Sequence, residues 1–353
     1  MIDLDIVGHP LFQLNLMIFL TWPSPVASHL TINPVFHAAG YALPFIERDI
    51  VVPNGSYRAL RTQGHHVNKI VQPDLLLEHS AAKVFLPIEC KRSGSSADPG
   101  QAMALLTLNG TELKPIIGKP PEEEWATIIA YLSVENNGTY LLGELSRLAG
   151  VLAGTGVAPA NGASLELLYR ADGIYLASVP HSASLPDLDL SRPTRVLALD
   201  PDEDPRPFYV IPYLADHGAE ADPVAEQCFR ESLRSSVLVL FGQLDDEPHE
   251  FELDSVITKG IAAWPIWNSA DRRKQIRGYV RKFIRETFAD LNKKLDIECR
   301  IDNQKIKLPA VTPEVALAVR DYMANAGFRH RTLDLSGPIQ GSFGFDNMPS
   351  PED

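Results

Sequence analysis

The sequence predicts an α/β protein in which a mixed β-sheet is flanked by helices, followed by a mostly α-helical C-terminal domain. Two observations lead to this prediction. Between residues 33 and 215, helical patterns alternate with short apolar runs, in the order helix, three strands, helix, strand. From residue 216 onward, apolar residues recur three or four positions apart over long segments that begin near Asp, Ser or Thr.

The elements of the first domain are marked by periodicity and by Pro, Gly and Asp residues. Helices are expected over residues 34–43, 98–110 and 140–154, the first continuing past Pro44 to residue 50. Strands are expected over residues 56–63, 68–79, 83–91, 125–134, 163–170 and 173–178. The strands at 68–79 and 83–91 are separated by a short turn and should form a hairpin.

The chain is expected to comprise four parts. These are a packed N-terminal segment (1–32), the first domain (33–215), a helical domain (216–335) and a flexible tail (336–353). The Pro/Asp-rich passage over residues 184–209 suggests the boundary near residue 215. Helices of the second domain are expected over residues 222–244, 252–268, 269–295 and 312–327.

The N-terminal segment contains an apolar run that resembles an export signal only superficially. Asp3 and Asp5 stand where such a signal would be positively charged. Gln13 and Asn15 interrupt the run, which is also too short to span a bilayer. No other stretch is a candidate span, so we expect a soluble, cytoplasmic protein without a membrane partner.

Composition limits the classes of protein to consider. Hydrophobic residues make up 45% of the chain and charged residues 22%, which is typical of a globular protein. The three cysteines, Cys90, Cys228 and Cys299, form no CxxC pair, which excludes a sequence-readable zinc ribbon and suits a reducing compartment. The net charge of -13 argues against a protein that coats nucleic acid non-specifically, but it allows a local basic groove.

Charged residues stand at the ends of the two apolar runs in the expected hairpin. Asp74 directly precedes one run, and Glu89 follows the other, with Lys91 two residues further on. Residues two apart in a strand share a face, so Glu89 and Lys91 point the same way, and a short hairpin brings Asp74 alongside. A carboxylate at the end of a buried strand is energetically unfavourable unless a metal ion or a hydrogen-bond donor interacts with it.

Two carboxylates that converge from adjacent strand ends suit a hard cation such as Mg²⁺ or Mn²⁺. The backbone carbonyl of Cys90, between Glu89 and Lys91, is expected to be a further ligand. A neighbouring lysine orients an attacking water and offsets developing negative charge. Asp74, Glu89 and Lys91 are therefore candidate catalytic residues, with Asp74 and Glu89 as metal ligands.

Pro73-Asp74 followed by Glu89-Cys90-Lys91 resembles the motif of the PD-(D/E)XK nuclease superfamily, whose members share a restriction-endonuclease-like core. The resemblance covers roughly residues 33–180 by the order of elements. Gln101, in the next helix, is similar to a catalytic glutamine of helicase-associated members, although Leu105 replaces the tyrosine of their QxxxY pattern. Glu47 resembles a helix-borne acid that assists metal binding in many members. Arg92 is placed to contact a phosphate.

Positive charge is concentrated between Asp271 and Leu295. The basic residues expected on one arc of this helix are Lys274, Arg277, Arg281, Lys282 and Arg285. Such an arc suits phosphate contacts, which hold a duplex without reading its sequence. A solvated helix face that pairs with acidic side chains of the same chain explains the pattern equally well.

These features predict a metal-dependent nuclease, with DNA favoured over RNA by the resemblance alone. The resemblance also implies an effector of bacterial or phage defence. Cleavage of both duplex strands would require two active sites and so favours a homodimer, and a partner subunit that gates activity is a further alternative. A different class remains open: a non-catalytic nucleic-acid-binding or assembly module that retains the nuclease fold.

Overall fold

The computed structural model describes residues 4–22, 32–92, 98–199 and 223–325. The chain forms two compact units. The first consists of Met1–Pro207 together with Ile266–Ser269, and the second of Phe208–Pro265 together with Ala270–Asp353. The boundary expected at residue 215 and the tail expected over residues 336–353 lie outside the described residues.

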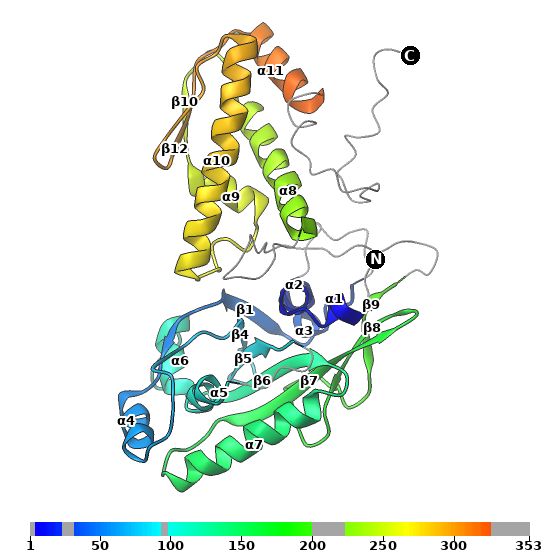
Figure 1. Cartoon of the computed structure of the whole chain (residues 1–353), viewed down its shortest axis with the longest axis vertical. Helices are drawn as coiled ribbons and strands as arrows, with labels where there is room; N and C mark the ends of the chain where they lie inside the picture. Colours follow the sequence, from blue (N-terminus) through cyan, green and yellow to red (C-terminus); the bar gives the residue numbers. More distant parts are fainter. Residues whose placement is uncertain (1–3, 23–31, 93–97, 200–222, 326–353) are drawn as a thin grey trace. The chain divides into compact units, whose positions relative to one another are not determined.

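A seven-stranded sheet forms the centre of the first unit (Figure 1). In spatial order its strands are β1 (Tyr41–Ile46), β4 (Leu75–His79), β5 (Val84–Cys90), β6 (Ala126–Val134), β7 (Asn161–Arg170), β8 (Gly173–Ser178) and β9 (Thr194–Ala198). The pairs β5–β6 and β6–β7 are parallel, and the other neighbours are antiparallel. The expected mixed sheet is confirmed.

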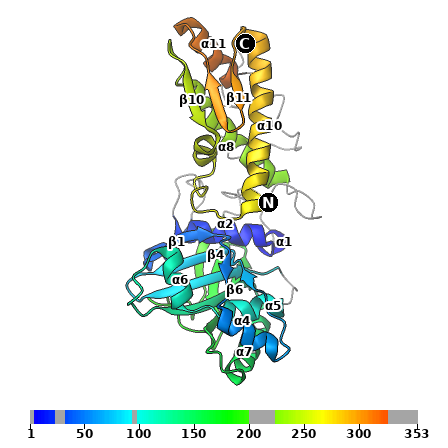
Figure 2. The same ribbon diagram turned by 90° about the vertical axis from the view of Figure 1, so that its left-hand side faces the viewer.

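Helices flank this sheet on both faces. They are α1 (Leu4–Val7), α2 (Pro10–Thr21), α3 (Val35–Ala38), α4 (Asn54–Thr62), α5 (Pro99–Leu106), α6 (Gly110–Ile117) and α7 (Gly138–Gly154). Helix α2 packs against β1 and β5, whereas α4, α5 and α7 gather on the side of the sheet away from it (Figure 2). Every residue of α2 from Leu11 to Thr21 is buried.

A buried cluster between the sheet and α5 shows which face of the strands α5 covers. Leu76, Phe85 and Tyr131 belong to one cluster of buried residues together with Leu105 of α5 and Leu145 of α7. Side chains alternate between the two faces of a strand. The residues two or four positions from Leu76 and Phe85 therefore share the face that α5 covers.

Two expectations for the first unit were wrong. Residues 41–46 form strand β1 and do not continue a helix, because they pair with β4 at the margin of the sheet, where Pro44 is tolerated at a bulge. The segment expected as a strand at 56–63 is helix α4, in which only Leu60 is buried. A single buried apolar side chain in a segment of otherwise exposed or half-buried residues is typical of a short amphipathic helix at the surface.

The hairpin and the helix that follows it are confirmed. Strands β4 and β5 pair antiparallel, with Leu75 opposite Ile88. Helix α5 begins as expected, because the Asp98 side chain accepts a hydrogen bond from the Gly100 backbone N–H at 2.9 Å, and Pro99 occupies the first position. It ends at Leu106, before the expected residue 110, which instead starts α6.

The second unit combines helices with a small sheet. Its helices are α8 (Pro223–Phe241), α9 (Leu253–Gly260), α10 (Ala270–Leu295) and α11 (Pro313–Asn325). Strands β10 (His249–Glu252), β12 (Lys305–Leu308) and β11 (Arg300–Asp302) form an antiparallel sheet in that order, which periodicity did not predict. A further pair, β2 (Ile50–Val51) and β3 (Ile70–Val71), belongs to the first unit.

Among the described helices, none has the length and apolar character needed to cross a membrane.

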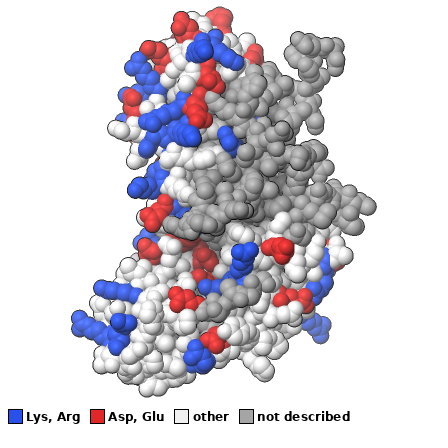
Figure 3. All heavy atoms as spheres, viewed as in Figure 1, with Lys and Arg blue, Asp and Glu red and all other residues white. Residues whose placement is uncertain are grey.

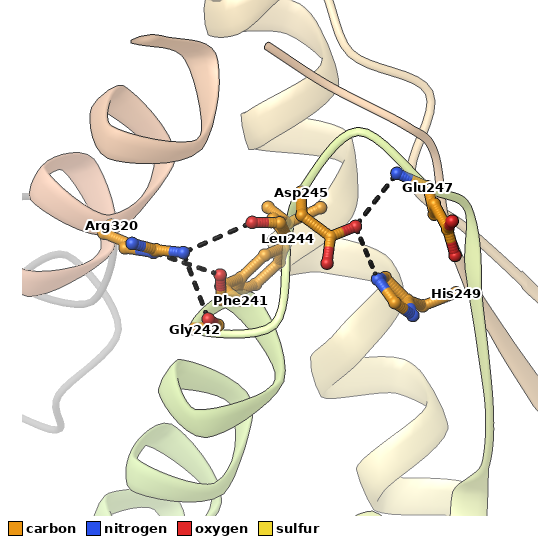
Figure 4. A network of polar contacts seen from close by, with 7 residues as sticks. All are labelled: Phe241, Gly242, Leu244, Asp245, Glu247, His249 and Arg320. Atoms are coloured by element: carbon orange, nitrogen blue, oxygen red, sulfur yellow. Dashed lines mark hydrogen bonds and ion pairs between the residues drawn. The ribbon is translucent and has the colours of Figure 1, made fainter. Parts of the chain in front are cut away.

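A polar network closes the C-terminal end of α8 (Figure 4). Arg320 of α11 donates to the carbonyl oxygens of Gly242 at 3.0 Å and Leu244 at 3.2 Å. Asp245 Oδ1 accepts from the Glu247 backbone N–H at 2.9 Å and lies 2.8 Å from His249 Nε2. The Glu247 hydrogen bond and the His249 contact lower the pKa of Asp245 and hold the turn between α8 and β10.

Candidate active site

The hairpin geometry brings Asp74 and Glu89 together. Asp74 immediately precedes β4, and Glu89 is the penultimate residue of β5. Because Leu75 pairs with Ile88, the next residue outward on each strand is Asp74 on one side and Glu89 on the other. Both lie on the face that α5 covers, since they are two residues from Leu76 and four from Phe85.

Each carboxylate is held by a specific donor. Asp74 Oδ2 accepts a hydrogen bond from the Cys90 backbone N–H at 2.6 Å. Glu89 Oε1 accepts from Gln101 Nε2 at 2.8 Å and from Lys91 Nζ at 3.1 Å. The structure therefore brings together the four candidate catalytic residues, which come from the start of β4, the end of β5 and helix α5.

Lys91 is held by hydrogen bonds of its main chain and by the ring of Tyr131 on the neighbouring strand. Its backbone N–H donates to the Leu132 carbonyl at 2.8 Å, and its own carbonyl accepts from Gln13 Nε2 of α2 at 3.1 Å. The ammonium nitrogen lies 5.3 Å from the centre of the Tyr131 ring, a cation–π contact. Gln13 was expected only as part of the packed N-terminal segment, and its role here was not predicted.

Burial makes full ionisation of the pair unfavourable. It raises the pKa of Asp74 well above its usual range, and the Glu89 charge raises it further. Burial also raises the pKa of Glu89, although Lys91 opposes this effect. Asp74 is only half-buried by surface exposure, whereas Glu89 is 7% exposed. A cation placed between the two groups would remove this repulsion.

The donor set fits a hard divalent cation. Glu89 Oε2 is buried and has no hydrogen-bond partner among the described residues, so this oxygen is left without compensation. The described residues contain no group of three or more His, Cys, Asp and Glu side chains arranged to hold a metal. A centre with two carboxylates leaves several positions for water or backbone oxygen, as Mg²⁺ commonly requires.

The backbone N–H of Cys90 donates a hydrogen bond to Asp74. A role of the Cys90 carbonyl as a metal ligand stays a prediction. Its thiol is buried, and burial raises the pKa of Cys90 well above the usual range. A thiol that stays protonated is a poor nucleophile and metal ligand. The side chain is therefore best explained as packing, as expected for a small buried residue.

Glu47 lies beside this site but not on a helix. It follows β1, and its backbone N–H donates to the Asp74 carbonyl at 3.0 Å. Its side chain is 5% exposed, and Oε2 accepts from Trp267 Nε1 at 2.7 Å. The expected helix was wrong because residues 41–46 form a strand, and a ligand role for Glu47 stays a prediction.

The basic residues of α10 differ in their surroundings. Arg277 forms a bidentate ion pair with Asp254, at 2.8 Å from Nε and 2.6 Å from Nη2. Arg281 Nε donates to the Asn303 carbonyl at 2.9 Å. These two arginines fit the explanation in which the basic face pairs within the chain. Figure 3 shows Lys and Arg side chains interspersed with acidic ones over the second unit.

Lys274, Lys282 and Arg285 of α10 are exposed and have no ion pair among the described residues. They form the part of the basic arc that remains available for phosphate contacts. Arg92 is exposed at the end of the hairpin, directly after Lys91.

The contribution of Trp267 to this site was not predicted. It comes from a segment expected to be helical and is 220 residues from Glu47 in sequence.

Comparisons of the chain with models of protein families, with curated proteins and with solved structures found no match. The chemistry of the site therefore has to be inferred from its own residues.

Proposed function

We propose that this chain is a metal-dependent nuclease of the PD-(D/E)XK type, which hydrolyses phosphodiester bonds in nucleic acid. The observation that supports this function is the convergence of Asp74, Glu89 and Lys91 at adjacent strand ends, with Gln101 bonded to Glu89. Charged side chains rarely occupy sheltered positions unless pairing or function retains them there. One ammonium group beside two carboxylates leaves a negative charge that a divalent cation would balance.

Asp74 and Glu89 would hold Mg²⁺ or Mn²⁺, with water and the Cys90 carbonyl as further oxygen ligands. When bound, the ion would lower the pKa of a coordinated water and polarise a phosphoryl oxygen. The Cys90 N–H orients the Asp74 carboxylate, and the Gln101 amide orients that of Glu89. The Lys91 ammonium would position the attacking water and offset the negative charge that develops on phosphate.

DNA is the favoured substrate, and a product with a 5′-phosphate is expected, both by resemblance to the superfamily. Arg92, next to the site, and the exposed basic residues of α10 would contact the phosphate backbone. The same resemblance supports a role as an effector in a bacterial or phage defence system, alone or with a gating partner subunit. Plating of phage on cells that carry wild-type or Lys91→Ala protein tests this role.

The test of the function is cleavage by the purified full chain. Wild type and Lys91→Ala are compared on supercoiled DNA, linear duplex, single strands and RNA, each with Mg²⁺, Mn²⁺ or EDTA. We expect metal-dependent cutting that Lys91→Ala lowers by about 100-fold or more. Arg147→Ala is the matched control, because it removes an exposed positive charge from α7, where Arg147 forms a surface ion pair with Glu144.

Two other outcomes would support different functions. Retained nucleic-acid binding without cutting, unaffected by Lys91→Ala but weakened by Arg281→Ala with Arg285→Ala, would indicate a non-catalytic binding module. Cutting that begins only after a cell extract is added, and that still requires Lys91, would indicate an effector gated by a partner subunit.

A further inference from the structure

The segment Ile266–Ser269 belongs to the first unit, although the residues on both sides of it in sequence belong to the second. Its main chain pairs with the end of β1. The Ile46 backbone N–H donates to the Ile266 carbonyl at 2.9 Å, and the Ile46 carbonyl accepts from the Asn268 N–H at 2.9 Å. Arg48 Nη1 also donates to Asn268 Oδ1 at 2.9 Å. The segment is therefore anchored to the residues on both sides of position 47.

Trp267 is the residue of this segment that reaches the candidate site. Its side chain is 0% exposed, and its indole N–H donates to Glu47 Oε2 at 2.7 Å. Glu47 has a φ angle of 49°, a left-handed backbone conformation that residues other than glycine adopt only where their surroundings impose it. The backbone bond from Glu47 to the Asp74 carbonyl places this constrained residue directly beside the carboxylate pair.

We infer that Trp267 is a positioning residue for the candidate metal centre, because its indole N–H fixes the Glu47 carboxylate next to Asp74. This inference rests on the proposed function. An indole N–H is a neutral donor, so it orients a carboxylate without cancelling its charge. Residues that orient the ligands of a metal ion change its affinity without having to bind it, and this is the role that the inference gives to Trp267. The Glu47 charge also raises the pKa of Asp74, as expected for neighbouring acids.

The inference is tested by metal binding alone, with no nucleic acid present. Mn²⁺ binding to the full chain is titrated by electron paramagnetic resonance for wild type, Trp267→Phe, Glu47→Gln and the double variant. We expect each single variant to bind Mn²⁺ about tenfold more weakly, within the range typical of residues that orient metal ligands. The double variant should bind no more weakly than Glu47→Gln alone, because Trp267 acts through Glu47.

Trp125→Phe is the matched control. Trp125 is also buried, and its indole N–H also donates to a carboxylate, Glu123 Oε2 at 2.9 Å, but this pair does not involve the candidate site. Its substitution should leave Mn²⁺ affinity unchanged. Equal effects of Trp125→Phe and Trp267→Phe would mean that loss of an indole N–H acts through general stability, which would overturn the inference.

The remaining outcomes separate this inference from the function on which it rests. Unchanged Mn²⁺ affinity in Trp267→Phe, together with lost affinity in Asp74→Asn, would overturn the role of Trp267 and leave the metal centre intact. A wild type that binds no Mn²⁺ would overturn both. If Trp267→Phe does not fold, Asn268→Ala replaces it, since it releases the same segment from Arg48. That variant should also weaken Mn²⁺ binding, and an unchanged affinity would overturn the inference.

Discussion

Single hydrogen bonds determine how the two carboxylates of the hairpin can act. Asp74 has one donor from the main chain, while Glu89 has two side-chain donors on one oxygen and none on the other. An oxygen that is buried without a partner is unfavourable in a folded protein. This oxygen is therefore the position at which we propose that a cation is bound.

Asp74→Asn is expected to stabilise the metal-free protein at high pH. Burial and Glu89 raise the pKa of Asp74 in the folded state, so the folded protein binds its proton more tightly than the unfolded chain does. At low pH both states are protonated, and the penalty is absent. It develops as pH rises above the usual aspartate pKa and through the raised folded value.

Thermal unfolding in EDTA measures this effect. At pH 8 the variant should melt at a higher temperature than wild type, by about 2–4 °C for each kcal/mol of repulsion removed, and the difference should vanish at about pH 4. Added Mg²⁺ should stabilise wild type but not the variant. Glu124→Gln, which neutralises an exposed acid, is the control. A variant that melts lower than wild type at pH 8 would contradict the proposed repulsion.

Gln101→Ala is expected to slow cleavage without unfolding the protein. The amide of Gln101 is one of the two donors to Glu89 Oε1, and a hydrogen bond to a charged group contributes about 1.5–3 kcal/mol. Its loss should lower kcat/KM about tenfold or more. Steady-state cleavage and a melting curve measure both effects. Gln72→Ala is the control, since it removes a similar amide contact, 2.9 Å from Asp49, at the surface. Equal rates in the two variants would argue against the assigned role.

At the scale of elements, helix α10 divides into a paired part and an exposed part. Arg277 forms an ion pair with Asp254. Near the start of α10, the guanidinium carbons of Arg273 and Arg277 lie 4.1 Å and 5.3 Å from the centre of the Trp264 ring. These groups stabilise the second unit. Only the exposed part can change partners at little cost, because its side chains have no ion pair to release among the described residues.

Replacement of Lys274, Lys282 and Arg285 together by alanine is expected to weaken nucleic-acid binding uniformly across sequences. The slope of log affinity against log salt concentration should fall by about one for each phosphate that the variant no longer neutralises. Fluorescence anisotropy at several salt concentrations measures this slope. Arg277→Ala is the contrasting variant: it should lower the melting temperature and leave the slope unchanged. If the triple variant binds like wild type, the basic arc is a solvated surface.

At the scale of the whole molecule, the first unit includes a piece of chain that follows part of the second unit in sequence. Ile266–Ser269 supplies the neighbour of Ile46 and the donor to Glu47. A chain that ends at residue 207 lacks this segment. It would leave the Glu47 carboxylate without its indole donor and the end of β1 paired with β4 alone.

A chain of residues 1–207 is therefore expected to melt at a lower temperature than the full chain and to bind Mn²⁺ more weakly. Calorimetry and Mn²⁺ titration test this, with a chain of residues 1–335 as the control that keeps the segment and removes only the C-terminal residues. Equal stability and Mn²⁺ affinity in the short chain and the control would show that the first unit does not depend on Ile266–Ser269.

The sequence by itself predicted the mixed sheet, the hairpin, the start of α5 and the proximity of Asp74, Glu89 and Lys91, whereas Gln101 was assigned to the site by the family resemblance. The mixed sheet was predicted from the order of elements, and the other features depend on alternation and spacing over short stretches, where neighbours in sequence are also neighbours in space. Only the tertiary structure decided that residues 41–46 form a strand, that helix α4 replaces the strand expected at 56–63, and that Glu47 pairs with Trp267. A contact that spans 220 residues leaves no local period, because its two halves are brought together by packing and not by chain geometry.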